Sequence, residues 1–372
     1  MALLSLQLSQ FRNIATLAFT AHPEFNLIYG ENGSGKTSLL EAIYYLAHGR
    51  SFRSRAHQRL IKDDAEHFTL HAKVSNNQQG YSLGLQRNRS AELLLRLNGA
   101  NVQRLAEFAS LLPVQLLTPD SFKLFFGGPK ERRQFFDMGV FHVEPGFFPV
   151  WLQFSRVLKQ RNALLKQRRR YDDEFAYWDQ QFASLAWQLN SQRQQYIDQL
   201  SEAYSQLIAA NPLLANVSMQ LQCGWPERID SEQALLNLLQ HNFEQDSRQG
   251  FSQYGPQKAD LKLKKAQLPV EEVLSRGQLK VLLFALKIAQ NNVISNSGHK
   301  QPLLLIDDLA SELDASSTQL VFEYLTQINS QVFITAINAD QVSPYIATER
   351  SKMFHVEHGQ ITARTDEDGR TT

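Results

Sequence analysis

A glycine-rich stretch at residues 30–37, GENGSGKT, has the residue types that bind phosphate. It follows an apolar run at 25–29 and precedes a helical apolar pattern, and its spacing is Gly30, four residues, then Gly35-Lys36-Thr37. Glycines let backbone N–H groups close around phosphate oxygens, a lysine adds positive charge, and a threonine hydroxyl can bind Mg²⁺. The alternative, a flexible Gly/Ser turn, leaves the flanking strand and helix patterns unexplained. The stretch predicts a loop that binds a nucleotide triphosphate.

Two adjacent carboxylates, Asp307 and Asp308, end a second apolar run at 303–306. Two carboxylates together at a strand end are rarely structural, because both must be desolvated or ionised together. We interpret Asp307 as the Mg²⁺ partner, through water, and Asp308 as the group that orients or deprotonates the attacking water. Lys36 and Asp307 are 271 residues apart (307 − 36). This separation predicts a large insertion within the nucleotide-binding domain.

The segment LSRGQLK lies upstream of these carboxylates and opens an amphipathic helix. Ser275 suits a helix N-cap. A serine and a glycine at a helix N-terminus also leave free N–H groups, which form an anion site, so both interpretations can hold. The segment ASELD follows Asp308 and supplies Ser311 and Asp314.

Taken in order, these motifs resemble those of the ABC-type ATPase heads. A wider set resembles the RecF family of bacterial DNA replication and repair proteins over about residues 3–360: FRN, GENGSGKTSLLEAIYYLAHGRSFR, GGPKERRQFFD, GPQKADL, LSRGQLK and DDLASELD. The resemblance implies a head-to-tail homodimer, with each ATP between the phosphate loop of one subunit and the Leu-Ser-x-Gly-Gln loop of the other. It also implies ATP-dependent DNA binding that works with RecO and RecR to load RecA at gaps coated by single-strand-binding protein.

The resemblance implies a role for individual residues at each motif. The ATP-binding set is Gly30, Glu31, Asn32, Gly33, Ser34, Gly35, Lys36, Thr37, Ser38, Arg12 and Asn13. Gln115, at the end of its strand, is the candidate glutamine that senses Mg²⁺ and the attacking water, so the catalytic set is Lys36, Gln115, Asp307 and Asp308, and the Mg²⁺ set is Thr37, Asp307 and Gln115. The residues that act on the partner's nucleotide are Ser275, Arg276, Gly277 and Gln278, with Ser311 and Asp314 in the loop after the carboxylates.

Two departures from the general ABC pattern concern catalysis. The usual glutamate after the first carboxylate is Asp308, one methylene shorter, and the usual switch histidine is absent, with Thr335 or Asn338 in its neighbourhood. Neither Thr335 nor Asn338 can act as a base near neutral pH. Because small misplacements of the attacking water are costly in rate, we expect slow hydrolysis. ATP then acts chiefly as a dimerisation switch.

The expected fold is α/β: an ABC-type ATPase head, with a mixed sheet around the phosphate loop and an antiparallel β subdomain, interrupted by a mainly helical lobe. That lobe contains a short antiparallel helical hairpin, because aromatic and aliphatic residues follow helical spacing from Trp151 to Leu200. The expected division is residues 1–120 and 251–362 for the head, 121–250 for the helical lobe, and 363–372 for a disordered tail.

Charge and composition give weaker predictions about partners. The net charge is only +1, but basic residues cluster in tracts that a DNA backbone could contact, and solvated helix faces show the same tracts. The candidate DNA contacts are Arg50, Arg53, Arg55, Arg59, Lys258 and Lys262, while the role of Arg168–Arg170 stays open. No base-reading motif is visible, so sequence-independent binding is expected. One cysteine, no signal-peptide pattern and no long apolar run favour a cytoplasmic location.

Other functions share some of these motifs. The ATP-binding subunit of an ABC transporter has a much shorter stretch between its motifs, and an SMC-like protein has hundreds of heptad residues in the insertion. A small-molecule kinase lacks the Leu-Ser-x-Gly-Gln loop. One alternative stays open: the same head could gate the assembly of a protein partner and not bind DNA.

Overall fold

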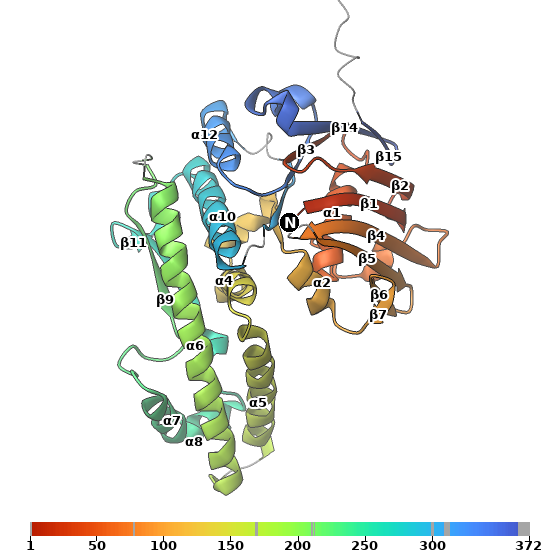
Figure 1. Cartoon of the computed structure of the whole chain (residues 1–372). Helices are drawn as coiled ribbons and strands as arrows, with labels where there is room; N and C mark the ends of the chain where they lie inside the picture. Colours follow the sequence, from red (N-terminus) through yellow and green to blue (C-terminus); the bar gives the residue numbers. More distant parts are fainter. Residues whose placement is uncertain are drawn as a thin grey trace, which may run out of the picture. The chain divides into compact units, whose positions relative to one another are not determined.

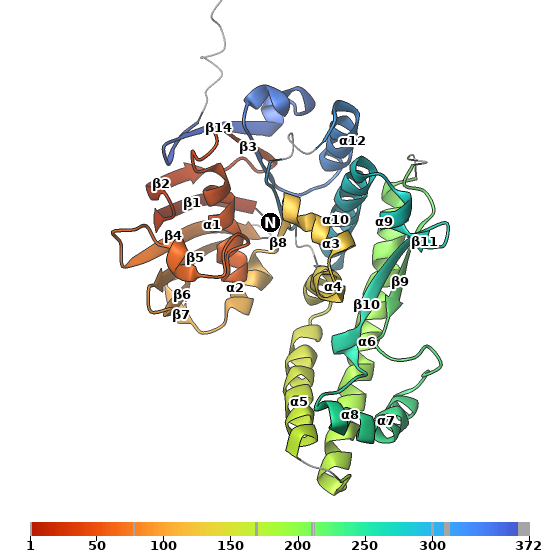
Figure 2. The same cartoon turned by 180° about the vertical axis from the view of Figure 1, so that it is seen from behind.

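The computed structural model describes residues 2–76, 79–167, 170–209, 211, 213–298, 301–308 and 313–363. The chain divides into two compact units, Met1–Phe122 with Arg276–Thr372, and the inserted Lys123–Ser275 (Figures 1 and 2). Residues 251–275, which the sequence analysis assigned to the head, therefore belong to the inserted unit. The reason is a strand pairing: β10 (Asp260–Lys265) lies antiparallel to β9 (Val217–Gln222) in a small sheet of that unit.

The first unit contains an antiparallel sheet with the strand order β2-β1-β4-β5-β6-β7. Leucines and valines alternate along β1 and β4 and are buried on one face, as expected for a sheet that covers a core on one side. The predicted antiparallel β subdomain is therefore present. Its strands are β1 (Ala2–Phe11), β2 (Ile14–Thr20), β4 (His67–Asn76), β5 (Gln79–Asn88), β6 (Leu93–Leu97) and β7 (Ala100–Val102).

The second sheet of this unit has the order β15-β14-β3-β13-β12-β8 and is parallel except for its edge strand β15. Its central strands are short and fully buried, which explains why they read as continuous apolar runs in the sequence. The strands are β3 (Phe25–Tyr29), β8 (Val114–Leu117), β12 (Leu303–Ile306), β13 (Val332–Ala336), β14 (Ser351–Glu357) and β15 (Gln360–Ala363). Because β3, β8, β12 and β13 run parallel, their carboxyl ends meet at one edge of the sheet.

Helix α1 (Lys36–His48) lies in the core that the two sheets share. Most of its residues are buried, which is typical of a helix that is covered on all sides. It ends at Gly49, which has a left-handed φ of 60°. The other helices of this unit are α2 (Leu105–Leu111), α10 (Arg276–Gly298) and α12 (Ala315–Thr326), with 3₁₀ turns η1 (His57–Leu60), η2 (Pro119–Phe122), η4 (Ala339–Gln341), η5 (Ser343–Tyr345) and η6 (Thr348–Arg350).

The inserted unit is mainly helical, as the sequence predicts. Helices α5 (Phe147–Gln167) and α6 (Asp173–Leu207) lie side by side and form the expected hairpin (Figures 1 and 2). The remaining elements are α3 (Lys123–Phe126), α4 (Pro129–Val143), β9, α7 (Glu232–His241), α8 (Phe243–Gln249), η3 (Pro256–Lys258), β10, β11 (Leu268–Pro269) and α9 (Val270–Val273).

A buried ionic cluster joins three parts of the inserted unit. Arg161 of α5 is fully buried and donates to Asp179 of α6 at 2.7 Å and to Asp246 of α8 at 2.7 Å. It also donates to Ser252 Oγ at 2.7 Å, and its guanidinium lies over the rings of two phenylalanines of α6. Burial raises the pKa of Asp179, and the ion pair with Arg161 opposes that shift. The cluster fixes the ends of the hairpin relative to the segment around residue 252.

In the part of the chain that the structure describes, no helix has the length and apolar character to cross a membrane.

Candidate functional site: a phosphate-loop cleft

The loop between β3 and α1 has the backbone of a phosphate-binding loop. Gly30 has a φ of 150°, and a Cβ there would lie 2.2 Å from the carbonyl oxygen of Val356, so only glycine fits at this position. Gly35 has a φ of 121° and directly precedes α1. The turn between β14 and β15 contacts the loop as well, because Gly359 N donates to Ser34 O at 2.9 Å. The β14–β15 hairpin thus holds the loop in place from outside.

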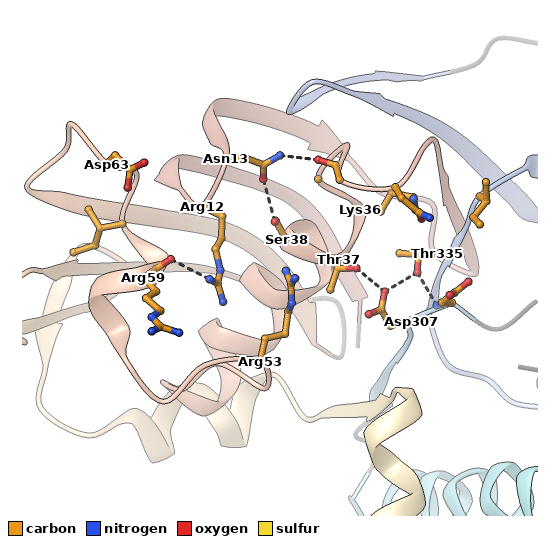
Figure 3. A pocket seen from close by; sticks show the side chains of 16 residues that line it. Arg12, Asn13, Lys36, Thr37, Ser38, Arg53, Arg59, Asp63, Asp307 and Thr335 are labelled. Carbon is orange, nitrogen blue, oxygen red and sulfur yellow. Dashed lines mark hydrogen bonds between the residues drawn. The ribbon is translucent and has the colours of Figure 1, made fainter. Parts of the chain in front are cut away.

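A cleft of about 510 Å³ opens beside this loop (Figure 3). Most of the residues predicted to bind ATP or Mg²⁺ line it, although they come from distant parts of the chain. Its lining is Arg12, Asn13, Asn32, Gly33, Gly35, Lys36, Thr37, Ser38, Arg53, Arg59, Ile61, Asp63, Asp307, Asp308, Thr335 and Ile337. Gly30, Glu31 and Ser34 belong to the loop without lining the cleft. The volume is in the usual range for a small-molecule site.

Lys36 begins α1, and its ammonium group lies over the loop. Its Nζ donates to Gly30 O at 2.6 Å and to Glu31 O at 2.9 Å. Burial lowers the pKa of Lys36, while the carboxylates of Asp308 and Asp307 act in the opposite direction. The hydroxyl of Ser34 is buried and has no hydrogen-bond partner among the described residues. A cation and a buried unpartnered hydroxyl beside backbone amides at a helix N-terminus suit the oxygens of a phosphate chain.

Thr37, Asp307 and Thr335 form a hydrogen-bonded cluster at the edge where β12 and β13 end. Thr37 Oγ1 donates to Asp307 Oδ1 at 3.0 Å, and Thr335 Oγ1 donates to the same oxygen at 2.8 Å. Thr335 Oγ1 also accepts from the backbone N of Asp308 at 2.8 Å, where the chain takes a left-handed φ of 58°. Thr335, which occupies the neighbourhood of the absent switch histidine, therefore contacts the carboxylate of Asp307 and the backbone of Asp308.

Burial raises the pKa of Asp307, and so does the neighbouring Asp308. The hydrogen bonds from Thr335 and Thr37 and the charge of Arg53 oppose this shift. A carboxylate and a hydroxyl in contact, next to a phosphate loop, form an oxygen donor set that suits Mg²⁺. A cation bound there would favour the ionised form of Asp307, so Mg²⁺ would suit a site whose carboxylate is otherwise destabilised.

Arg12 is fixed by Glu41, a residue that the sequence analysis missed. Arg12 donates two hydrogen bonds to this fully buried carboxylate, from Nε at 2.9 Å and from Nη2 at 2.7 Å. Its Nη1 donates to Arg59 O at 3.0 Å, and the Ser51 hydroxyl donates to Glu41. A signal was present in the sequence. Glu41 is the only charged residue between Lys36 and His48 in a strongly apolar helix, and a buried charge requires a partner.

Asn13 connects the end of the β1–β2 turn to the phosphate loop. Its Nδ2 lies 3.4 Å from Gly33 O and from Ser34 O, and its Oδ1 accepts from Ser38 Oγ at 3.1 Å (Figure 3). Both residues predicted from the FRN motif thus lie at the cleft, with Arg12 held by α1 and Asn13 held by the loop.

Gln115 does not lie at the cleft. It is 1% exposed in the middle of β8, where it pairs in register with Leu304, and its Nε2 donates to Gln290 Oε1 of α10 at 3.1 Å. The strand continues for two more residues before it reaches the edge where Asp307 lies. Gln115 therefore cannot sense the Mg²⁺ or the attacking water directly. At that edge Thr118, with Pro119 and Phe122, lines a small cavity that also includes Asp307 and Asp308.

The residues predicted to act on the partner's nucleotide are outside this cleft. Arg276, Gly277 and Gln278 form the first turn of α10, and Ser275 directly precedes it. Ser311 lies outside the described residues. Asp314 is the N-cap of α12 and accepts from Ser317 N at 2.8 Å. Asn338 caps the 3₁₀ turn η4.

The structure divides the candidate DNA contacts into different surroundings. Arg53 and Arg59 line the cleft itself, so their positions favour contact with a bound nucleotide over contact with DNA. Lys262 forms an ion pair with Asp260 at 2.9 Å, and Lys258 lies over the ring of Phe251 at 5.1 Å. Arg50 and Arg55 are exposed and follow α1. Arg168 and Arg169 lie outside the described residues.

The parallel strands with a phosphate loop and paired carboxylates at their carboxyl edge, beside an antiparallel sheet, define an ABC-type ATPase head. A family model described as RecF/RecN/SMC N terminal domain matches residues 2–362. The chain is 43% identical to the DNA replication and repair protein RecF of Pseudoalteromonas translucida, over 98% of this chain and 100% of that protein. The chain therefore belongs to the RecF family.

Solved structures share the fold. The recombination mediator protein RecF-ATP in the RecFOR pathway matches with a TM-score of 0.85 at 23% identity, over 98% of each chain. An SMC head bound to the C-winged helix domain of ScpA matches with a TM-score of 0.59 at 15% identity, over 99% of each chain. These likenesses confirm the expected head with its inserted helical lobe.

Proposed function

We propose that this protein is an ATP-dependent DNA-binding protein of DNA repair and replication restart, whose ATP-bound form is a head-to-tail homodimer. The observation that supports the ATP-dependent part of the proposal is the hydrogen-bonded cluster of Thr37, Asp307 and Thr335, whose oxygens suit Mg²⁺ beside a phosphate loop. The name of the Pseudoalteromonas relative, a DNA replication and repair protein, supports the choice of DNA as the partner.

In this proposal the triphosphate lies over the loop, and Lys36 exchanges its two carbonyl partners for phosphate oxygens. Thr37 and Asp307 would hold Mg²⁺, which supplies positive charge where the phosphates accumulate negative charge. Asp308 would orient or deprotonate the attacking water. Its backbone is set by Thr335, so the position of its carboxylate depends on a residue of the neighbouring strand.

Hydrolysis is expected to be slow. Asp308 is one methylene shorter than the glutamate that is usual in ABC-type ATPases. The switch histidine is absent, and the side chains of Thr335 and Asn338 in its neighbourhood cannot act as bases. Gln115 is buried away from the cleft and offers no alternative. ATP binding would therefore act mainly as the signal for dimerisation on DNA, and slow turnover would reset it.

Membership of the RecF family supports the proposed partners. In the dimer, Ser275, Gly277 and Gln278 of one subunit would approach the γ-phosphate held by the other. The name of one solved relative places it in the RecFOR pathway, which supports RecO and RecR as partners and loading of RecA as the outcome. Of the candidate DNA contacts, the four that do not line the cleft are Arg50, Arg55, Lys258 and Lys262. In this proposal they contact the phosphate backbone of the DNA without reading its bases.

Sedimentation with Mg²⁺ and ATP, with and without a gapped duplex at low salt, tests the proposal. The informative variants are Lys36→Met, which removes the loop cation, and Ser275→Arg, which blocks the surface that the proposal assigns to the partner's γ-phosphate. Lys73→Met, an exposed lysine on β4, is the matched control. The wild type and the control should dimerise only with ATP, and the DNA should sediment with the dimer alone.

Two other outcomes have different meanings. If the dimer forms with ATP but never carries DNA at low salt, the ATP switch stands and the partner is a protein. If the wild type stays monomeric while it hydrolyses ATP quickly, both the dimer and the proposed role of ATP are wrong.

A further inference from the structure

One wall of the cleft is formed by a short segment, residues 57–66, that is far from the phosphate loop in the sequence. Arg59, Ile61 and Asp63 of this segment line the cleft. Figure 3 shows Asp63 and Arg59 at one end of the cleft and Asp307 and Thr335 at the other. Since the loop and Asp307 would hold the phosphates, this segment faces the nucleoside of a bound nucleotide.

The end of β1 supports the segment on its first side. Phe11 forms an isolated β-bridge with Ile61, and Arg12 N donates to Leu60 O at 2.7 Å. Lys62 N donates to Gln10 O at 3.0 Å. These contacts fix residues 60–62.

Arg89, in the turn between β5 and β6, supports the second side. Its Nε donates to Ala65 O at 2.8 Å, and its Nη2 donates to Asp63 O at 2.6 Å and Lys62 O at 3.2 Å. Its backbone N donates to Glu66 O at 3.1 Å.

The carbonyl of Arg89 extends this contact to the start of the segment. It lies 3.4 Å from the Nε2 donor of Gln58 and 3.2 Å from a ring nitrogen of His57. One residue thus contacts the segment near both of its ends, although its own side chain does not line the cleft.

We propose that Arg89 is a positioning residue for the nucleotide, which holds segment 57–66 as the nucleoside-side wall of the cleft. The inference rests on the proposed nucleotide site. A planar guanidinium reaches three carbonyls at once because its donors form a rigid fork, and a lysine in its place has only one ammonium group. Without Arg89 the carbonyls of Asp63 and Ala65 lose the guanidinium as their donor, and Lys62 O keeps only its bond from the backbone N of Ala65. The wall then loses its fixed position.

The test compares ATP with inorganic tripolyphosphate, measured by isothermal titration calorimetry at constant Mg²⁺. Tripolyphosphate needs only the loop, whereas ATP also needs the nucleoside wall. Arg89→Ala should weaken ATP binding roughly tenfold and leave tripolyphosphate binding unchanged. The affinity of Arg89→Lys for ATP should lie between that of Arg89→Ala and that of the wild type. The matched control is Arg96→Ala, on the neighbouring strand β6, where the guanidinium contacts only Asn101 among the described residues.

The kinetic counterpart is a higher KM for ATP at unchanged kcat, because Lys36, Asp307 and Asp308 keep their contacts. Equal weakening of ATP and tripolyphosphate would show a general loss of structure and overturn the inference, as would unchanged affinity for both. If the wild type binds neither ligand, the nucleotide site itself is wrong. The failure of the inference can therefore be distinguished from the failure of the proposed function.

Discussion

The hydroxyl of Thr335 at the end of β13 donates to the carboxylate of Asp307 at the end of β12, at a distance of 2.8 Å. The same hydroxyl accepts from the backbone N of Asp308, at 2.8 Å. One side chain therefore sets the orientation of the proposed Mg²⁺ ligand and of the residue that would orient the attacking water. Strands β12 and β13 are adjacent and parallel, which brings their carboxyl ends together.

Replacement of Thr335 by valine should slow ATP hydrolysis by roughly ten- to a hundredfold, because small displacements of catalytic groups are costly. The loss of a hydrogen bond to the ionised carboxylate should also raise the pKa of Asp307 further, so that more Mg²⁺ is needed for half-maximal rate. Steady-state ATPase assays over a range of Mg²⁺ concentrations measure both effects. Thr335→Ser keeps the hydroxyl and should behave like the wild type; a valine variant with full activity would contradict the role of this residue.

Glu41→Gln should destabilise the protein by about 1–3 kcal/mol, because it removes the buried anion that accepts two hydrogen bonds from Arg12. The effect is moderated because the Arg12 side chain keeps 18% exposure. Chemical denaturation followed by circular dichroism measures the change. Glu244→Gln removes an exposed ion pair with Arg248 and should produce no measurable change. Equal midpoints for the two variants would mean that the Arg12 pair has no structural importance.

Arg161→Met should destabilise the inserted unit by about 3–5 kcal/mol, because it leaves Asp179 and Asp246 buried without a cation. Tryptophan fluorescence during urea unfolding is a suitable measurement, because the four tryptophans of the chain all lie in this unit. They are Trp151, Trp178, Trp187 and Trp225. Arg156→Met, an exposed position on the same helix, is the control and should leave the midpoint unchanged.

His48 at the end of α1 should make the first unit sensitive to acid. Burial lowers the pKa of His48 to about 4, and its ring stacks on Tyr44 with centroids 4.0 Å apart. The unfolded chain therefore binds this proton at a higher pH than the folded chain, so stability is present above pH 6.5 and is lost as the pH falls toward 4. By pH 5 the loss should reach about 2 kcal/mol.

Comparison with His48→Phe isolates this contribution, since phenylalanine can stack on Tyr44 and does not titrate. Thermal unfolding between pH 5 and pH 8 should give a steeper loss of stability in the wild type than in the variant. Parallel curves for the two proteins would show that His48 is not the group responsible.

Local sequence determined the parts of the site that lie within one segment. The phosphate loop, the helix α1 that follows it and the apolar strand that leads to Asp307 were all predictable, because glycine torsions, helix periodicity and short apolar runs are local properties. The helical hairpin followed from helical periodicity as well. A resemblance to the RecF family then gave the order in which these segments combine.

Only the tertiary structure decided which residues from distant segments meet. Gln115 has the residue type expected of a Mg²⁺-sensing glutamine, but the register of β8 against β12 buries it two residues before the edge of the sheet. Arg53 and Arg59 look like DNA contacts in a basic tract, yet the chain returns past the end of β1 and places them in the cleft. Residues 251–275 join the inserted unit through the pairing of β10 with β9. In each case strand register and long-range packing decide the outcome, and neither leaves a periodic signal in the sequence.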